Sequence, residues 1–597
     1  REVIWAAGQG ATRSQMTTDE AARAASFQAY EQIEKWRASL PARPDLVQAV
    51  EGFAASTDLS TLAADQRTFV ERWRKDIRLA GGSLTGAARD EVARLTDRLI
   101  ELGTAYLNNL ATPKRFEVPL ADLDGVPDAC VASLERSQVP NKVEFVLSYP
   151  NYLAVLEQGR NRDLRKRVYG EWLRRGYPEN IAILEEVLES RRRIAALLGY
   201  PSWQALRAEN LASPGPEWTN AFIAEMTDRL RPIVAREQAG MTALLRSQAA
   251  DPDDFQLQDW DWRFADQQQR AALGAGPDAV MPYLELDRVL AGLAELSEQV
   301  FGLRLVPHPE RVGWDPEVRP FDLHDAATDR VLARLFVDPI AREGKQPGAW
   351  MEILLPGRPR DGVPPTIALV MNAPATAGGP TLLSVNEVET IFHEYGHVMN
   401  FACGNGRFAL HNDAWLPFDF IEGPSSFVGR WALEPPVMER FARHHETGAP
   451  IPGSLMDALR RAQTLNHAVE VQRQFWLARL DALLHGAERI SIDDAEAVAW
   501  PIRDLPFPEG SHISANLSHI ASGAYHGALY GYAWSELIRD DLLARFEEAG
   551  VTDPEVGARY RETILEIGWV DDPVAAVNEF LGRPWSADAF LARAAEG

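Results

Sequence analysis

The residues best able to do chemistry stand in the segment HEYGH, which runs from His393 to His397. On a helix these two histidines lie one turn apart, so both imidazoles project from one face and can bind the same metal ion. Glu394 lies about 100° further round the helix, where its carboxylate can reach a water molecule on that metal. The spacing therefore predicts a catalytic metal site in which Glu394 serves as the general base.

Signals on both sides predict that the segment is helical. Ser384 can cap the helix, Glu387 completes a capping box with it, and Gly404 suits the C-terminal end. A separate face carries an apolar stripe made of Val388, Phe392, Tyr395, Met399 and Ala402. Two surface histidines on an ordinary amphipathic helix are the alternative. The agreement of the caps and the periodicity with the motif favours the metal site.

A catalytic zinc site needs a third protein ligand and an open position for water. The metzincin pattern requires glycine and histidine where this chain has Asn400 and Cys403, which excludes that class. Glu422 is the candidate, because its segment FDFIEGPSSFVGRW is helical in character and Pro424 is tolerated in a first helical turn. Its apolar neighbours make a plain surface glutamate the weaker interpretation.

Groups behind the ligands should orient the imidazoles through hydrogen bonds. Glu389 lies one turn before His393 on the same face, and Asp419 lies near Glu422 in the sequence. Either carboxylate could serve in this way, and either could instead be a solvated helix charge.

Together these residues resemble the M3 family of zinc metallopeptidases, the family of thimet oligopeptidase, oligopeptidase A and dipeptidyl carboxypeptidase. Further similar stretches are FVDPIAREGKQPGAWM, RRRIAALLGYPSW, LARLDALLH and SHIASGAYHGALYGYAWSE. The likeness covers residues 150–597 well and the N-terminal helices loosely. It implies a gluzincin: a mainly α, two-lobed helical ellipsoid with a deep substrate channel, one Zn²⁺ per chain and a small sheet beside the HExxH helix.

The segment 509–536 combines histidines, tyrosines and glycines in a pattern with two interpretations. Phenol and imidazole donors can stabilise an oxyanion beside a mobile glycine-rich backbone, whereas glycines at every fourth position also suit close helix packing. The resemblance favours the first interpretation and implies that His519, Tyr525 and Tyr532 contact the substrate and the tetrahedral intermediate. The glycine-rich segment would then be a loop that closes on the peptide.

Three positions depart from the family pattern. Ser426 and Gly429 stand where the family has glutamine and glutamate, and Leu529 replaces a further tyrosine of the loop. Because the ligands and the general base are unchanged, we expect hydrolysis to be retained. Substrate preference and the tuning of the metal site are the properties that these three departures leave open.

Apolar periodicity predicts helices over most of the chain, and residues 112–150 form a connector broken by prolines. The runs DRVLARLFVDPI, GAWMEILL and PTIALVMN predict a small sheet just before the metal helix. The edge of this sheet could pair with an extended peptide, or the sheet could only support the helix. We expect an N-terminal helical region, residues 1–150, that forms part of one lobe, and a catalytic region, residues 151–597.

The composition limits the kinds of binding partner and of cellular location that we expect. A net charge of −25 on 597 residues argues against nucleic-acid or anionic-membrane partners, and no run of about 18 apolar residues predicts a membrane span. The two cysteines, Cys130 and Cys403, form no disulfide framework and fit a reducing compartment. We expect a cytoplasmic monomer; a periplasmic location is the alternative if a signal peptide was removed before Arg1.

The predicted activity is zinc-dependent hydrolysis of peptide bonds in short, unstructured oligopeptides. The alternative is a dipeptidyl carboxypeptidase, which releases C-terminal dipeptides and needs a cationic side chain to capture the free carboxylate of the substrate. A non-catalytic zinc-containing peptide binder is a remote alternative, because a binder has no need of the general base Glu394.

Overall fold

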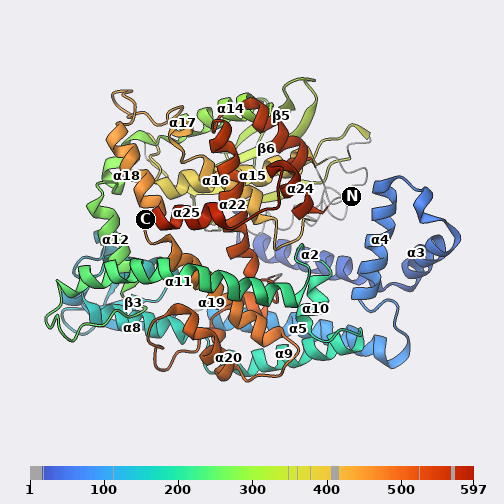
Figure 1. Ribbon diagram of the computed structural model, residues 1–597, viewed down its shortest axis with the longest axis horizontal. Helices are drawn as coiled ribbons and strands as arrows, with labels where there is room; N and C mark the ends of the chain where they lie inside the picture. Colours follow the sequence, from blue (N-terminus) through green and yellow to red (C-terminus); the bar gives the residue numbers. More distant parts are fainter. Residues whose placement is uncertain are drawn as a thin grey trace. The chain divides into compact units, whose positions relative to one another are not determined.

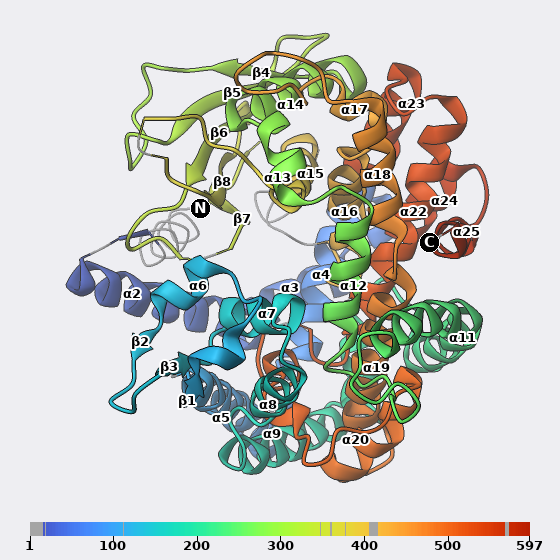
Figure 2. The same ribbon diagram turned by 90° about the vertical axis from the view of Figure 1, so that its left-hand side faces the viewer.

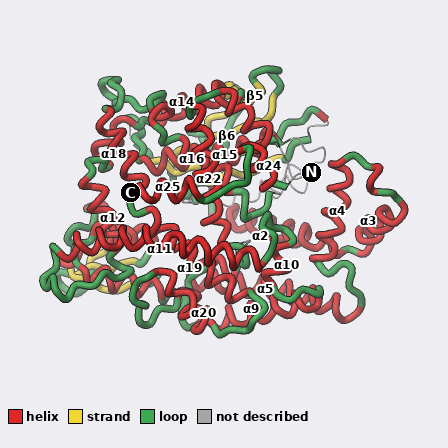
Figure 3. The backbone as a smooth tube through the Cα atoms, in the orientation of Figure 1, coloured by secondary structure: helices red, strands yellow, loops and turns green. Residues whose placement is uncertain are grey.

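The computed structural model describes residues 16–596, apart from 18, 112, 347, 359–360, 377, 405–415, 524 and 567–571. Helices make up most of the described chain (Figure 3), and the strands form one sheet of three and one of five. The prediction of a mainly α fold with a small sheet is confirmed. Among the described residues, no helix is both long and apolar enough to cross a lipid bilayer.

The chain forms two compact units, each assembled from segments that are distant in the sequence. Unit 1 contains Arg1–Thr85, Gly276–Arg460 and Trp534–Phe590, and unit 2 contains Gly86–Ala275, Arg461–Ala533 and Leu591–Gly597. The boundary expected near residue 150 separates regions by family likeness and stays a prediction.

Unit 1 contains the five-stranded sheet, in the order β4-β5-β6-β8-β7. β6 and β8 pair in parallel, and the other neighbours are antiparallel. Because β7 is last in this order, it is an edge strand. The predicted runs correspond to β6, β7 and β8. Two further strands were not predicted, because β4 and β5 each contain a proline and their apolar residues are interrupted by charged ones, by Arg304 in β4 and by Asp322 in β5. The bounds are β4 (Leu303–Pro307), β5 (Arg319–Asp325), β6 (Val331–Ile340), β7 (Trp350–Leu355) and β8 (Thr366–Ala373).

The helix that carries the two histidines is α15 (Val385–Cys403), and it contacts β6, β7 and β8 (Figure 2). The predicted capping box is present: Ser384 Oγ accepts the N–H of Glu387, and the Glu387 carboxylate accepts the N–H of Ser384. Gly404 is the C-terminal cap. All five residues of the predicted apolar stripe are buried, so this face holds the helix in the core of unit 1.

α16 (Glu422–Trp431) packs against α15 and is anchored by an aromatic core. The ring of Phe427 has its centroid 4.9 Å from those of Phe546 and Tyr560, and the indole N–H of Trp431 donates to the carbonyl of Val551. The other helices mostly within unit 1 are α2 (Glu20–Ser39), α3 (Pro44–Ser56), α4 (Ala64–Leu79), α13 (Pro277–Val280), α14 (Leu286–Phe301), α17 (Pro435–Met438), α18 (Gly453–Thr464), α22 (Tyr530–Ala549), α23 (Pro554–Tyr560) and α24 (Pro573–Leu581).

Unit 2 is a group of helices around one large apolar core, with a three-stranded sheet in the order β1-β3-β2. Figure 2 labels the three strands. The strands are β1 (Arg115–Pro119), β2 (Glu135–Arg136) and β3 (Lys142–Val146). The helices are α5 (Gly86–Ala111), α6 (Asp128–Ser133), α7 (Tyr149–Gln158), α8 (Arg162–Leu173), α9 (Glu179–Leu197), α10 (Trp203–Ala208), α11 (Pro216–Arg246), α12 (Trp262–Ala272), α19 (His467–His485), α20 (Ile492–Ala499), α21 (Ser518–Ala521) and α25 (Asp588–Glu596).

Candidate metal centre

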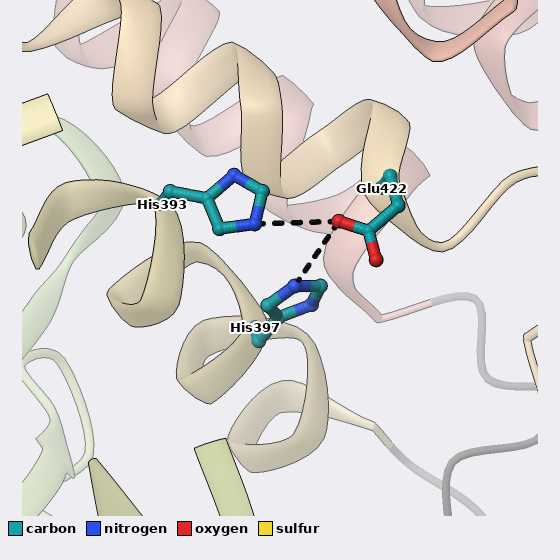
Figure 4. Close-up of side chains that lie close together, drawn as sticks. All are labelled: His393, His397 and Glu422. Atoms are coloured by element: carbon teal, nitrogen blue, oxygen red, sulfur yellow. Dashed lines mark ion pairs between the residues drawn. The ribbon is translucent and has the colours of Figure 1, made fainter. Parts of the chain in front are cut away.

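The three predicted ligands lie together in unit 1 (Figure 4). His393 and His397 project from one face of α15, and Glu422 is the first residue of α16. Oε2 of Glu422 lies 3.3 Å from Nε2 of His393 and 3.6 Å from Nε2 of His397. Pro424 falls in the first turn of α16, where its missing N–H costs no helical hydrogen bond.

These distances fit one tetrahedral ion. With metal–ligand bonds of about 2.0–2.1 Å, two ligand atoms of a tetrahedral zinc site lie about 3.3–3.4 Å apart. The two measured separations from Glu422 are close to this value. Two imidazoles and one carboxylate also form the donor set typical of catalytic zinc, with a fourth position left for water.

The ligands are electrostatically coupled. Burial alone would raise the pKa of Glu422, but hydrogen bonds with His393 and His397 hold that pKa well below its ordinary value. Burial opposes a charge on His393, yet the adjoining Glu422 carboxylate raises the pKa of this imidazole. The result is an ionised carboxylate facing two ring nitrogens, which suits a divalent cation.

Glu394 is buried on the same helix, 8% exposed. Burial raises the pKa of its carboxyl group, against the opposing effects of His397, His393 and the backbone amide of Met351. Met351 belongs to the edge strand β7, so the sheet supports the general-base candidate directly. No sequence signal could reveal this contact, because a backbone N–H is present at every non-proline residue.

The departures at Ser426 and Gly429 lie on α16, close to this group. A Cβ on Gly429 would lie 3.0 Å from the carbonyl oxygen of Glu389 and 3.2 Å from Cβ of His393. The space that a glutamate would need is therefore occupied by α15. Glu389 raises the pKa of His393 electrostatically, and Asp419 is fully buried. The orienting roles of these two carboxylates stay predictions.

A second group, His444, His445 and Glu446, also brings three potential ligand atoms within 4.8 Å of one another. Nδ1 of His444 accepts the N–H of Glu446, so the neutral ring carries its proton on Nε2 and offers no free lone pair there. Arg288 also donates to the carbonyl oxygens of both histidines, which places a positive charge beside them. This group is the weaker metal candidate.

The predicted substrate-contacting residues lie in unit 2 and form a cluster of their own. The rings of Tyr525 and Tyr532 stack with centroids 4.7 Å apart, and His519 lies 5.7 Å and 6.0 Å from them. All three side chains are half-buried. His512, which belongs to the same segment, stacks on Tyr177 and lies outside this cluster.

The third departure, Leu529, is buried in the core of unit 2. A tyrosine hydroxyl at this position would need a hydrogen-bond partner within an apolar cluster. The side chain therefore acts in packing.

Comparison with known proteins identifies the class of enzyme. A model of peptidase family M3 matches residues 155–596. The chain belongs to peptidase family M3. It is accordingly a metallopeptidase, and its His-His-Glu group is the candidate site for the metal that the family uses.

Two relatives from Escherichia coli are similar to this M3 peptidase along most of their length. Oligopeptidase A is 27% identical over 558 residues, which cover 89% of this chain and 82% of the relative. Dipeptidyl carboxypeptidase is 30% identical over 526 residues, which cover 85% and 77%. The M32 carboxypeptidase from Deinococcus radiodurans has a similar fold, with a TM-score of 0.56, 12% identity, and coverage of 99% of this chain and 94% of that chain.

Proposed function

We propose that this M3 peptidase is a zinc-dependent oligopeptidase that cleaves short, unstructured peptides. The observation that carries the proposal is the spacing of the Glu422 carboxylate from the ring nitrogens of His393 and His397, 3.3 Å and 3.6 Å. The buried Glu394 lies beside these histidines on α15. The likeness to oligopeptidase A supports the substrate class.

The residues would divide the reaction as follows. His393, His397 and Glu422 would hold the zinc ion, which when bound supplies Lewis-acid activation of water and of the scissile carbonyl group. Glu394 accepts a proton from the attacking water and returns it to the leaving amine. Its raised pKa, caused first by burial, suits this double role.

The oxyanion of the tetrahedral intermediate needs further donors. His519, Tyr525 and Tyr532 carry an imidazole and two phenol groups, which we assign to this task on the strength of the family resemblance and of their clustering. Burial lowers the pKa of His519, so its imidazole is neutral at pH 7 and donates through one N–H.

The edge strand β7 is the proposed docking site for the substrate backbone. An extended peptide can add to a sheet edge through main-chain hydrogen bonds, which makes binding largely independent of sequence. Met351 of β7 contacts Glu394, so a peptide on this edge would run beside the general base.

Release of C-terminal dipeptides is the second candidate, favoured by the 30% identity to dipeptidyl carboxypeptidase. Mass spectrometry of products from a mixed peptide library, with and without 1,10-phenanthroline, tests both candidates. Internal cleavage that the chelator abolishes supports the oligopeptidase. Release of dipeptides only, lost when the C-terminus is amidated, would instead identify the carboxypeptidase. No cleavage under any metal condition would refute both.

We also propose a cytoplasmic location and a monomeric state. Two free cysteines, Cys130 and Cys403, fit a reducing compartment. Fractionation of the source cells and sedimentation of the purified chain would test the two proposals.

A further inference from the structure

Unit 2 contains a buried chain of polar side chains that the proposed mechanism does not use. Asp481 and His485 lie one turn apart on α19, and Arg191 lies on α9. Figure 1 labels both helices. Oδ1 of Asp481 lies 2.8 Å from Nδ1 of His485, and Nε2 of His485 lies 2.8 Å from Nη1 of Arg191. The three residues are at most 3% exposed, so their charges must be compensated within the chain.

These contacts determine the tautomer of His485. A guanidinium group has only donors, so Arg191 donates to Nε2 of the imidazole, which therefore carries no proton. The ring proton is on Nδ1 and is donated to Asp481. A neutral imidazole thus connects the Arg191 cation to the Asp481 anion.

Asp481, at the anionic end of this row of side chains, binds the backbone that follows Tyr525. The Asp481 carboxylate accepts the N–H of Gly527 at 2.9 Å and the N–H of Leu529 at 3.1 Å. Gly527 has a φ of +78°, a conformation that residues with a Cβ rarely adopt, and it lies within the turn that the N–H of Ala528 closes by donating to the carbonyl of Tyr525.

The cationic end binds the backbone that follows His519. Arg191 donates to the carbonyl oxygens of Ile520 and Ala521. Between the two ends, Nδ1 of His526 accepts the indole N–H of Trp203 at 3.0 Å. Residues 520–523 and 525–529 are therefore held at their start, in their middle and at their end by side chains of α9, α10 and α19.

We propose that Arg191, His485 and Asp481 are positioning residues that hold the backbone at residues 520–521 and 527–529, so that His519 and Tyr525 stay beside Tyr532. The inference rests on the proposed function, in which these rings contact the reacting peptide. His519 directly precedes the carbonyl groups bound by Arg191, and Tyr525 lies two residues before the first N–H bound by Asp481. Loss of the network would let both rings move while the metal ligands, on other elements, stay in place.

The test compares two buried aspartates of unit 2. Asp481→Asn removes an acceptor for the loop N–H groups, whereas Asp259→Asn disrupts a similarly buried partner of Arg503 and Tyr169 that does not contact the loop. We expect Asp481→Asn to lower kcat about 10- to 100-fold with a small change in KM and full metal content. Asp259→Asn should lower the thermal midpoint without this loss of kcat. Equal kcat in the two variants would overturn the proposal.

A mutant cycle that combines Asp481→Asn with changes at His519 and Tyr525 separates a positioning role from a general loss of order. In a background of His519→Ala and Tyr525→Phe, Asp481→Asn should cost little further activity, because the groups it positions are gone. A full additional loss there would contradict the proposal. If Asp481→Asn does not fold, Gly527→Ala takes its place, since a Cβ there meets no atom closer than 3.6 Å and perturbs mainly the backbone.

Hydrogen exchange gives a readout that does not depend on activity. The amides of Gly527 and Leu529 should be protected in the wild type and exchange faster in Asp481→Asn, while exchange in α15 is unchanged. Equal exchange in both proteins would overturn the positioning role even if the enzyme is active. A wild type that cleaves no peptide yet shows the protection would refute the proposed function alone.

Discussion

Gly396, the glycine of HEYGH, lies directly against the backbone of Ser425. A Cβ on Gly396 would come within 2.8 Å of the Ser425 Cα and within 3.3 Å of Val428 Cβ, closer than the packing of α15 on α16 permits. This close approach brings the start of α16, with Glu422, to the two histidines of α15. The glycine is therefore a requirement of the His-His-Glu arrangement, although it offers no ligand atom itself.

Gly396→Ala is expected to weaken metal binding. The added Cβ forces the two helices apart, which lengthens the distances from Glu422 to the imidazoles, and the affinity should fall about 10- to 100-fold. Competition with a chelator measures this affinity. Gly52→Ala is the control, because nothing lies within 4 Å of its Cβ and Gly52 is on α3. Unchanged affinity in Gly396→Ala would mean that the helices can separate without cost.

Glu394→Gln should lower kcat by about 10²–10⁴ while the metal content stays that of the wild type. The amide keeps the size of the side chain but cannot accept a proton from water. Elemental analysis of the purified variant, together with steady-state kinetics on one peptide, checks both parts. Near-normal turnover would show that another group is the base.

Removal of the metal should abolish peptide hydrolysis reversibly. After dialysis against a chelator, added Zn²⁺ should restore activity to the wild type but not to His397→Ala, which lacks one of three ligands. Titration with Zn²⁺, Co²⁺ and Mn²⁺ identifies the ion that works at the lowest concentration. Activity of the metal-free protein would remove the basis of the proposed mechanism.

Tyr525→Phe and Tyr532→Phe are each expected to lower kcat about 10²–10³-fold with a smaller change in KM. Each substitution removes one hydroxyl donor and leaves the stacked ring in place. Tyr177→Phe is a suitable control, because this exposed tyrosine stacks on His512 outside the cluster. An unchanged kcat in either test variant would exclude that hydroxyl from the reaction.

His526 predicts a pH dependence of stability. Burial, followed by the charges of Arg191 and Arg207, holds the pKa of His526 well below its ordinary value, so the folded protein binds fewer protons here than the unfolded chain. The contribution of His526 to the free energy of unfolding is therefore lost as the pH falls below about 6.5, with a slope of at most about 1.4 kcal/mol per pH unit.

His526→Gln removes the titratable imidazole, and with it this pH dependence, and keeps an acceptor for the indole N–H of Trp203. As the pH is lowered from 7.5 to about 5.5, the stability of the variant should rise relative to that of the wild type. The difference between their thermal midpoints at each pH measures this change. A difference that stays constant with pH would contradict the assignment of a depressed pKa to this histidine.

Local signals in the sequence were sufficient for the metal helix. Ser384, Glu387 and Gly404 mark its ends, and the spacing of His393 and His397 follows from the helical repeat, because caps and periodicity act between residues a few positions apart. Glu422 could be proposed from its apolar and helical context together with the excluded metzincin pattern. The family resemblance then supplied His519, Tyr525 and Tyr532, which no local rule selects.

Tertiary structure alone decided the remaining relationships. The contact of Met351 with Glu394, the fit of Gly396 against Ser425, and the network from Arg191 to Asp481 join residues between 29 and 290 positions apart in the numbering. Two of these depend on backbone atoms, which every sequence position supplies, and the third depends on which buried side chains happen to face one another. Such contacts arise only when the whole chain packs, so the sequence determines the chemistry of this enzyme and the fold determines how its reacting groups are held.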